Sequence, residues 1–126
     1  MAKTIMMIVG VVFILIGILG FFNNPILGIF AVDTLHNLVH LISGILALIF
    51  ASQGESQARK FAIILGVVYG LVTILGFLSG DSGKIVGLIA VNSADNFLHL
   101  VLTIVFFIVG FTKSGASNSG MSSPSM

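Results

Sequence analysis

The chain has 126 residues, of which 57% are hydrophobic and only 7% carry a charge at neutral pH. An ordinary globular domain has roughly 25% charged residues, and a chain of this size cannot hide so much apolar surface in one core. The net charge of +1 is too small to favour nucleic acid, and the absence of Cys excludes disulfides, thiol catalysis and thiolate metal sites. Most of the chain is therefore expected to be surrounded by lipid.

The first apolar segment runs from Thr4 to Phe22. As a helix it is long enough to cross the roughly 30 Å hydrocarbon core of a bilayer. A cleavable signal peptide is the alternative, but this apolar stretch is too long and no small-x-small cleavage site follows it. Pro25 ends the predicted helix, because proline cannot continue the hydrogen-bond ladder. We predict a retained transmembrane helix.

Three further helices are predicted, from residue 33 or 34 to 51, from 61 to 79, and from 92 or 93 to 112. Asp33, Thr34 and Ser93 are favourable N-caps, and a short polar loop over residues 52–60 separates the second helix from the third. The Gly66-x-x-x-Gly70 spacing lets a neighbouring backbone approach closely, and we interpret it as a packing feature. Together these segments predict an all-α, four-helix transmembrane bundle over residues 1–112. The Ser/Gly-rich tail over residues 113–126 is predicted to be disordered.

The orientation of the bundle follows from its basic residues. Lys3, Arg59, Lys60 and Lys113 fall on one side of the predicted spans, and only Lys84 falls on the other. The positive-inside rule then predicts a multi-pass protein of the cell membrane with both termini in the cytoplasm.

The two halves of the chain resemble each other. A shift of 59 positions takes Asn37 to Asn96, and it also brings Gly17 to Gly76 and His40 to His99. Random apolar segments would seldom match at Gly, Asn and His together. We interpret the chain as two tandem helical hairpins, over about residues 1–53 and 60–112, related by a pseudo-twofold axis along the membrane normal.

Two polar clusters open the second and fourth predicted helices. Residues three or four apart share one face of a helix, so each cluster forms a polar stripe that should face other helices and not lipid. Polar groups at this depth must find partners, because hydrocarbon offers none. The two clusters are Asp33, His36, Asn37 and His40, and Asn92, Asp95, Asn96 and His99.

Our preferred interpretation of these clusters is structural. They would form an interhelical hydrogen-bond network near the outer surface, in which Asn37 bonds across the pseudo-axis to Asn96 or His99. This interpretation needs no cofactor. The bilayer is then the main partner, and a homo-oligomer or another membrane protein is a further candidate partner.

The second interpretation is a metal or haem site. His36-x-x-x-His40 has a chelating spacing on one helix face, and His99, with Asp33 and Asp95, would complete a site suited to zinc or iron. Alternatively, the repeat-related pair His40 and His99 would be the axial ligands of one haem.

The third interpretation is a small proton or ion transport component, or a pH sensor, because ionisable groups in membrane helices are functional candidates. An enzyme of the soluble type is not expected, because the sequence offers no nucleophile-base pair, no phosphate loop and no large domain outside the membrane.

The pattern Val32-Asp33-x-x-His36-Asn37-x-x-His40-Leu41-x-x-Gly44, with Val91-Asn92-x-Ala94-Asp95-Asn96-x-Leu98-His99-Leu100, resembles the small prokaryotic membrane proteins grouped as domain of unknown function 4383. The resemblance extends over nearly the whole chain to about Thr112. It implies a four-span integral membrane protein and supplies no activity. All eight residues of the two polar clusters match motif positions. Thr103 stands opposite Gly44, where the resemblance implies Gly, so equally close packing in the two halves is not expected.

Overall fold

The computed structural model describes residues 1–80 and 83–112, so the predicted disordered tail lies outside the described residues. Each of its four helices is long and apolar enough to cross a membrane, and the predicted all-α fold class is confirmed. The elements, in chain order, are α1 (Ala2–Gly20), α2 (Thr34–Ser52), α3 (Glu55–Ser79), β1 (Lys84–Ile85), β2 (Ile89–Ala90) and α4 (Ser93–Phe111).

Two connections differ from the prediction. The polar segment predicted as a loop over residues 52–60 is mostly helical, because α3 already begins at Glu55 and only Gln53 and Gly54 separate it from α2. Hydropathy detects the apolar part of a helix and misses a polar first turn that extends into water. The predicted loop over residues 80–91 contains the two short antiparallel strands β1 and β2, which are too short to give a periodic signal.

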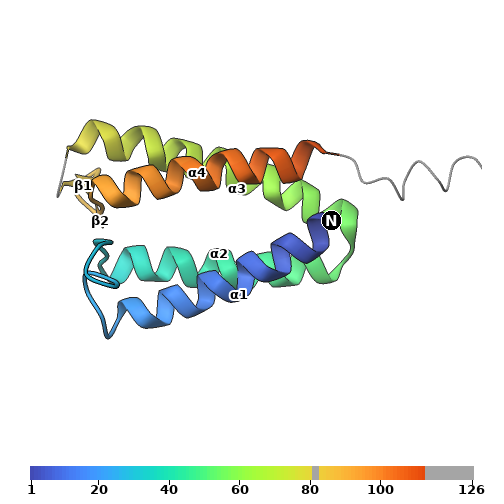
Figure 1. Cartoon of the computed structure of the whole chain (residues 1–126), viewed down its shortest axis with the longest axis horizontal. Helices are drawn as coiled ribbons and strands as arrows, with labels where there is room; N and C mark the ends of the chain where they lie inside the picture. The colour runs from blue at the N-terminus through green and yellow to red at the C-terminus, as the bar shows by residue number, and fades with distance from the viewer. Residues whose placement is uncertain (81–82, 113–126) are drawn as a thin grey trace, which may run out of the picture.

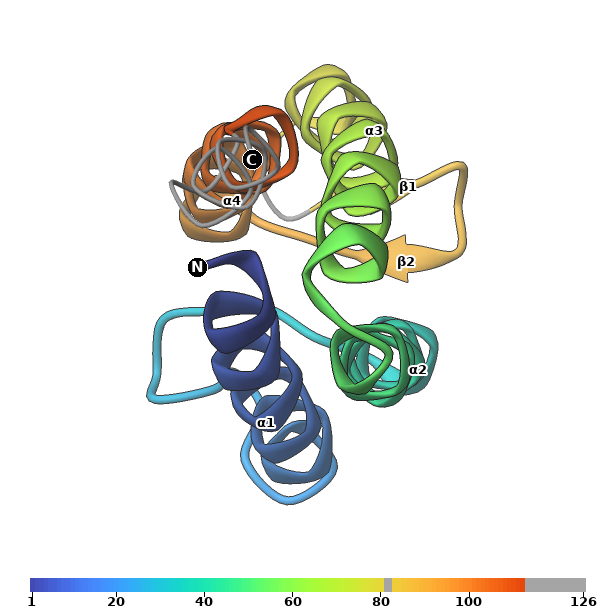
Figure 2. The same ribbon diagram turned by 90° about the vertical axis from the view of Figure 1, so that its right-hand side faces the viewer.

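The helices form two antiparallel hairpins, α1 with α2 and α3 with α4, which lie side by side (Figure 1). The N-terminus, the α2–α3 connection and the end of α4 lie at one end of the bundle. The end-on view shows the helices at the corners of a bundle, with α1 diagonal to α3 and α2 diagonal to α4 (Figure 2). The helices α1 and α4 approach each other near the N-terminus and diverge towards the opposite end.

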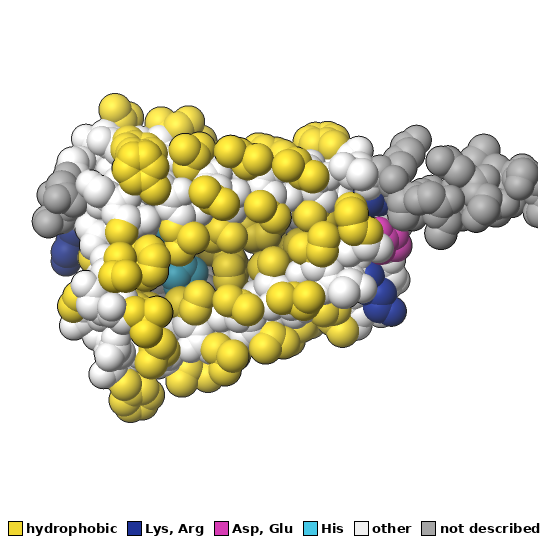
Figure 3. All heavy atoms as spheres, viewed as in Figure 1, with side chains coloured by type: hydrophobic (Ala, Val, Ile, Leu, Met, Phe, Trp, Pro, Cys, Tyr) yellow, Lys and Arg dark blue, Asp and Glu magenta, His cyan; other side chains and the backbone are white. Residues whose placement is uncertain are grey.

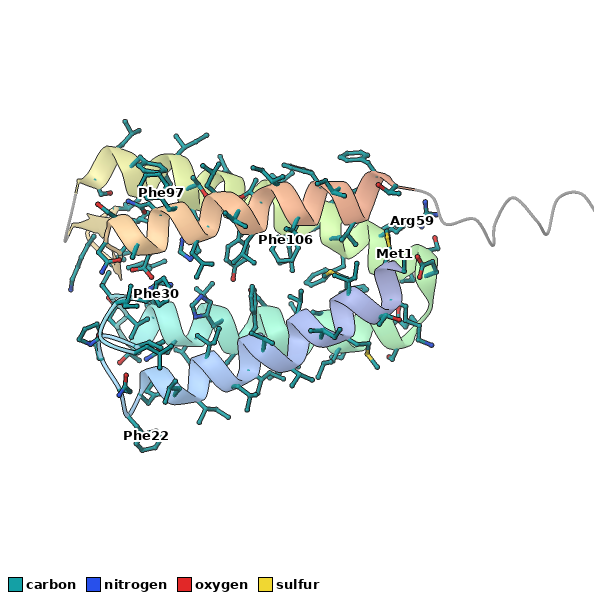
Figure 4. All side chains as sticks on the ribbon, viewed as in Figure 1. Met1, Phe22, Phe30, Arg59, Phe97 and Phe106 are labelled. Atoms are coloured by element: carbon teal, nitrogen blue, oxygen red, sulfur yellow. The ribbon has the colours of Figure 1, made fainter. Side chains whose placement is uncertain are left out.

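The core lies between the hairpins and combines large aromatic residues with alanines. Phe13, Tyr69 and Phe106 meet there with ring centroids 5.6–6.2 Å apart, and Phe106 is seen between the two hairpins in Figure 4. Towards the N-terminal end the buried residues are mainly small, with Ala47 and Ala62 fully buried. The outward faces are covered by exposed aliphatic side chains, as lipid contact requires (Figure 3).

Corresponding contacts recur in the two hairpins. A β-carbon added at Gly20 would overlap Asn37, and one added at Gly76 would overlap Asn96. Likewise Phe13 packs on His40, and Tyr69 packs on His99, each pair with ring centroids 5.5 Å apart. In these contacts α2 and α4 are related by the predicted shift of 59, but α1 and α3 are related by 56.

The predicted correspondence between the first helices of the two halves is therefore wrong by three residues. Gly20, and not Gly17, corresponds to Gly76 in its contact with the asparagine of the paired helix. The extra residues lie in the connection after α3. The two connections are otherwise alike at their tips, where Leu27-Gly28 and Val86-Gly87 all have φ between 53° and 73°, the sign that tight hairpin turns need. Duplication of an ancestral hairpin stays a prediction.

Glu55 joins the two hairpins at the N-terminal end. Its carboxylate accepts hydrogen bonds from the Met1 amino group at 3.1 and 3.2 Å, from Ala2 N at 2.8 Å and from Lys3 N at 3.0 Å. The first N–H groups of a helix have no partner within it and carry its positive dipole end. A carboxylate from the start of α3 thus caps α1.

We expect Glu55→Gln to lower the free energy of unfolding by about 1 kcal/mol, because a neutral amide with one oxygen replaces a charged cap. Thermal unfolding in detergent, followed by circular dichroism, measures the change. The control is Ser56→Ala, next to Glu55 and exposed. An equal loss in both variants would show that the cap contributes nothing specific.

Candidate functional site

Three histidines meet in the half of the bundle away from the N-terminus. His36 and His40 lie one turn apart on α2, and His99 comes from α4 of the other hairpin. Ring centroids are 4.6 Å apart for His36–His40, 5.6 Å for His36–His99 and 6.3 Å for His40–His99. Their exposed fractions are 2%, 8% and 2%. One ring nitrogen from each residue lies within 4.8 Å of the other two, so the structure brings the three predicted metal-ligand candidates together.

The protonation of His36 follows from its hydrogen bond. Its Nδ1 lies 2.8 Å from the carbonyl oxygen of Ala90, which belongs to β2, just before the second helix of the other hairpin. A carbonyl only accepts, so Nδ1 carries the hydrogen and, in the neutral ring, Nε2 keeps a lone pair. Histidines that bind metals are commonly held in this way, with the second ring N–H on a backbone carbonyl.

The cluster also contains buried nitrogens without partners. Within the described residues, His36 Nε2, His40 Nδ1 and His99 Nδ1 are buried and make no hydrogen bond. Buried polar atoms are normally satisfied, so three unpartnered nitrogens in one cluster make it a candidate ligand site.

A small cavity touches all three rings. It has a volume of about 20 Å³, a little more than the roughly 10–15 Å³ that one water molecule needs. A guest the size of a single ion or water fits it, whereas an organic molecule does not. The cavity is lined by His36, Val39, His40, Tyr69, Val72, Ile89 and His99.

A second, larger cavity lies on the other side of His40 and His99, where α1 and α4 diverge. Its volume is about 140 Å³, and a histidine side chain is visible in the hollow between the hairpins in Figure 3. Asp95 joins the two histidines as a polar part of its wall, and apolar residues from α1, α4 and the first connection form the rest. These apolar residues are Phe13, Ile16, Leu19, Ile26, Leu27, Phe30, Val32, Leu98 and Leu102.

Side chain-to-backbone hydrogen bonds join the two hairpins, and each hairpin supplies a side chain that bonds to the backbone of the other. Asp33 caps α2 by accepting from His36 N at 2.9 Å, and its second oxygen accepts from Ala90 N at 3.0 Å. In the opposite direction, Asn92 Nδ2 donates to Ile29 O at 2.8 Å. Asn92 and Asp95 also form a capping box at the start of α4.

The predicted bond from Asn37 to Asn96 or His99 is not formed. The Oδ1 atoms of Asn37 and Asn96 are buried without a hydrogen-bond partner among the described residues, and each lies against a glycine of its own hairpin, Gly20 or Gly76. The two amides therefore pack within the hairpins and do not bridge them. Their polar oxygens accept only the weak contact that a glycine Cα–H offers.

The predicted packing glycines behave unequally. A β-carbon at Gly66 would lie 2.8 Å from Phe107, whereas one at Gly70 would lie 3.4 Å from Thr103. In the other hairpin Gly44 faces the backbone of Gly10 at a hypothetical 2.7 Å. In the second hairpin, Thr103 stands at the repeat position of Gly44, and the facing helix contributes Gly70 beside it. The two halves therefore pack differently, in agreement with the expectation.

Three contributors to the site were not among the sequence candidates. Ala90 and Ile29 act through backbone atoms, for which a sequence carries no side-chain signal. Tyr69 lies on α3 and packs on His99, but it was not among the residues that the sequence singled out. A shift of 56 between the first helices would have placed it beside His99.

Comparison with known proteins identifies a family for this chain. A sequence model of the family described as Domain of unknown function (DUF4383) matches residues 3–112, which include both hairpins and all eight residues of the polar clusters. No curated protein and no solved structure shows a significant match.

Proposed function

Since the chain belongs to the DUF4383 family, whose description assigns no activity, we propose a function from its geometry: it is a multi-pass membrane protein that binds one first-row transition-metal ion through His36, His40 and His99. Zn²⁺ is the leading candidate, because imidazole nitrogens and a three-histidine set with an open fourth position suit it.

The observation that carries the proposal is the state of His36. Its Nδ1–H donates to Ala90 O, and its Nε2 is buried and unpartnered. One ring nitrogen from each of the three histidines also lies within 4.8 Å of the other two. A buried lone pair that is oriented by a backbone carbonyl has little purpose in an apolar bundle unless it meets a ligand.

The distances fit an ion after a small adjustment. Zn–N bonds of about 2.0–2.1 Å in a tetrahedral site place ligand nitrogens roughly 3.4 Å apart. The nitrogens here lie within 4.8 Å of one another, so a shift of roughly an ångström closes the set. Because His99 comes from the other hairpin, that closure also draws the two hairpins together.

Haem fits this site poorly. Pockets that enclose ligands as large as a drug molecule usually measure about 300–1,000 Å³, and the two cavities that meet His40 and His99 measure only about 20 and 140 Å³, too small for a whole porphyrin. A bare ion is the better match to the small cavity.

A bound divalent cation also needs negative charge nearby, because three neutral imidazoles leave its charge uncompensated in a lipid environment. Asp95 is buried and lines the larger cavity with His40 and His99, and Asp33 accepts a hydrogen bond from the backbone of His36. These two carboxylates support the choice of a cation as the ligand.

Proton or ion transport has less support. The buried side chains beyond Tyr69 and Thr73, towards the N-terminal end, are apolar: Ala2, Met6, Ala47, Ala51, Ala58, Phe61, Ala62 and Val109. A transport path would need polar groups or water in that half.

The positive-inside rule supports a cytoplasmic location for both termini, because the N-terminus and the end of α4 lie at the same end of the bundle (Figure 1). The metal site then belongs to the outer half of the membrane.

The test is metal analysis of protein purified without a histidine tag, after chelator treatment and reconstitution with Zn²⁺. We expect about one zinc per chain in the parent protein and a loss of at least tenfold in affinity for His36→Phe, His40→Phe or His99→Phe. Cobalt substitution gives an independent absorption spectrum of the coordination geometry. The control is Ser52→Ala, at the far end of α2. Substoichiometric zinc in the parent, or unchanged binding in all three histidine variants, would reject the proposal.

A further inference from the structure

The larger cavity, between α1 and α4, is a candidate site for an organic ligand. It shares His40 and His99 with the small cavity of the proposed metal site but is otherwise lined by different residues. It opens on a face covered with exposed aliphatic side chains (Figure 3). A guest therefore enters it sideways from the hydrocarbon, and a molecule dissolved in the bilayer has direct access.

The wall of this cavity specifies the chemistry of a guest. Phe13 and Phe30 provide aromatic faces, while His40, Asp95 and His99 form its polar part. Asp95 already accepts a hydrogen bond from the backbone of Asn92. A saturated acyl chain would offer no partner to the imidazoles of His40 and His99, which costs free energy in an apolar environment. An anionic head group would be repelled by the carboxylate of Asp95.

A phenolic hydroxyl meets both requirements. It donates one hydrogen bond and accepts others, so it can be satisfied by an imidazole in either tautomer or by the carboxylate. Its ring packs on aromatic side chains. The volume of about 140 Å³ is close to the roughly 150 Å³ of an apolar protein cavity that accommodates benzene.

We propose that this lateral cavity binds the ring of a neutral, lipid-soluble phenol, with its hydroxyl on His40, His99 or Asp95 and its alkyl substituents towards the bilayer. The proposal goes beyond the metal site and does not depend on it.

The experiment uses methyl- and imidazole-labelled protein in detergent micelles, treated with a chelator so that the result is independent of metal binding. Thymol is the probe, and p-cymene, the same molecule without the hydroxyl, is the matched control. We expect thymol to shift the methyl signals of Ile16, Leu98 and Leu102 and the imidazole signals of His40 and His99 in a saturable way. We expect p-cymene to bind about tenfold more weakly, because it leaves the polar groups unpaired.

A second arm changes the protein. Leu98→Trp places a large ring at the wall of the cavity and should weaken thymol binding at least tenfold, whereas Val101→Trp, on the lipid-facing side of α4, should leave it unchanged. Unfolding temperatures confirm that both variants are folded. Equal binding of thymol and p-cymene, shifts spread over all lipid-facing methyls, or equal effects of the two Trp variants would overturn the proposal.

Discussion

Gly76→Ala and Gly20→Ala are each expected to lower the free energy of unfolding by about 3 kcal/mol. In both cases the added β-carbon overlaps Oδ1 of a buried asparagine on the paired helix, Asn96 or Asn37. Overpacking of a tight contact typically costs about 1–3 kcal/mol, and the upper end applies because the amide is buried on all sides. Unfolding in mixed micelles, followed by circular dichroism, measures the loss.

Gly70→Ala is the matched control on the same helix, because its β-carbon would reach only ordinary contact distance from Thr103, at 3.4 Å. We expect it to be neutral or slightly stabilising, since Ala favours a helix over Gly. The double variant Gly76→Ala/Asn96→Ala should recover part of the loss, because it removes the overlapping amide. Equal destabilisation by Gly70→Ala and Gly76→Ala, or no recovery in the double variant, would contradict this account of the contact.

Zn²⁺ is expected to stabilise the folded protein strongly. A ligand that binds only the native state, at a hundred times its dissociation constant, adds about 2.7 kcal/mol to the free energy of unfolding. The effect should be large here because the ligands span both hairpins, so separation of the hairpins must release the ion. Unfolding of chelator-treated protein with and without added Zn²⁺ measures the difference.

The same titration with Mg²⁺ should have no effect, because Mg²⁺ prefers oxygen ligands. His99→Phe should remove the stabilisation by Zn²⁺, while Ser52→Ala retains it. A stabilisation that persists in His99→Phe would place the zinc elsewhere on the protein and count against the three-histidine site.

The sequence predicted those helices whose position follows from their hydropathy and whose starts are marked by N-capping residues. Four spans follow from the apolar segments, and Asp33 and Asn92 mark the starts of α2 and α4 because their side chains satisfy the first free N–H groups. The start of α3 was missed because a polar helical turn in water has no apolar periodicity. The register of the repeat was missed in the first helices because an insertion in a loop leaves no mark on a comparison made without gaps.

At the site, the sequence identified the three histidines, since rare imidazoles in membrane-spanning segments stand out. It could not show that Asn37 and Asn96 point at glycines of their own hairpins, because an amide on a helix face has several neighbours within reach. Nor could it show the bond from His36 to Ala90, which depends on where the second connection places its backbone. Packing between helices, and not the pattern along them, determines these contacts.

The reciprocal bonds of Asp33 and His36 to Ala90, and of Asn92 to Ile29, have a consequence for biogenesis. When the first hairpin leaves the ribosome, the segment that will supply Ala90 has not yet been synthesised. Until it arrives, one carboxylate oxygen and one imidazole N–H at the entrance of α2 have only water or the insertion machinery as partners. A nascent chain halted after its second span therefore has polar groups at the start of α2 that lack their protein partners.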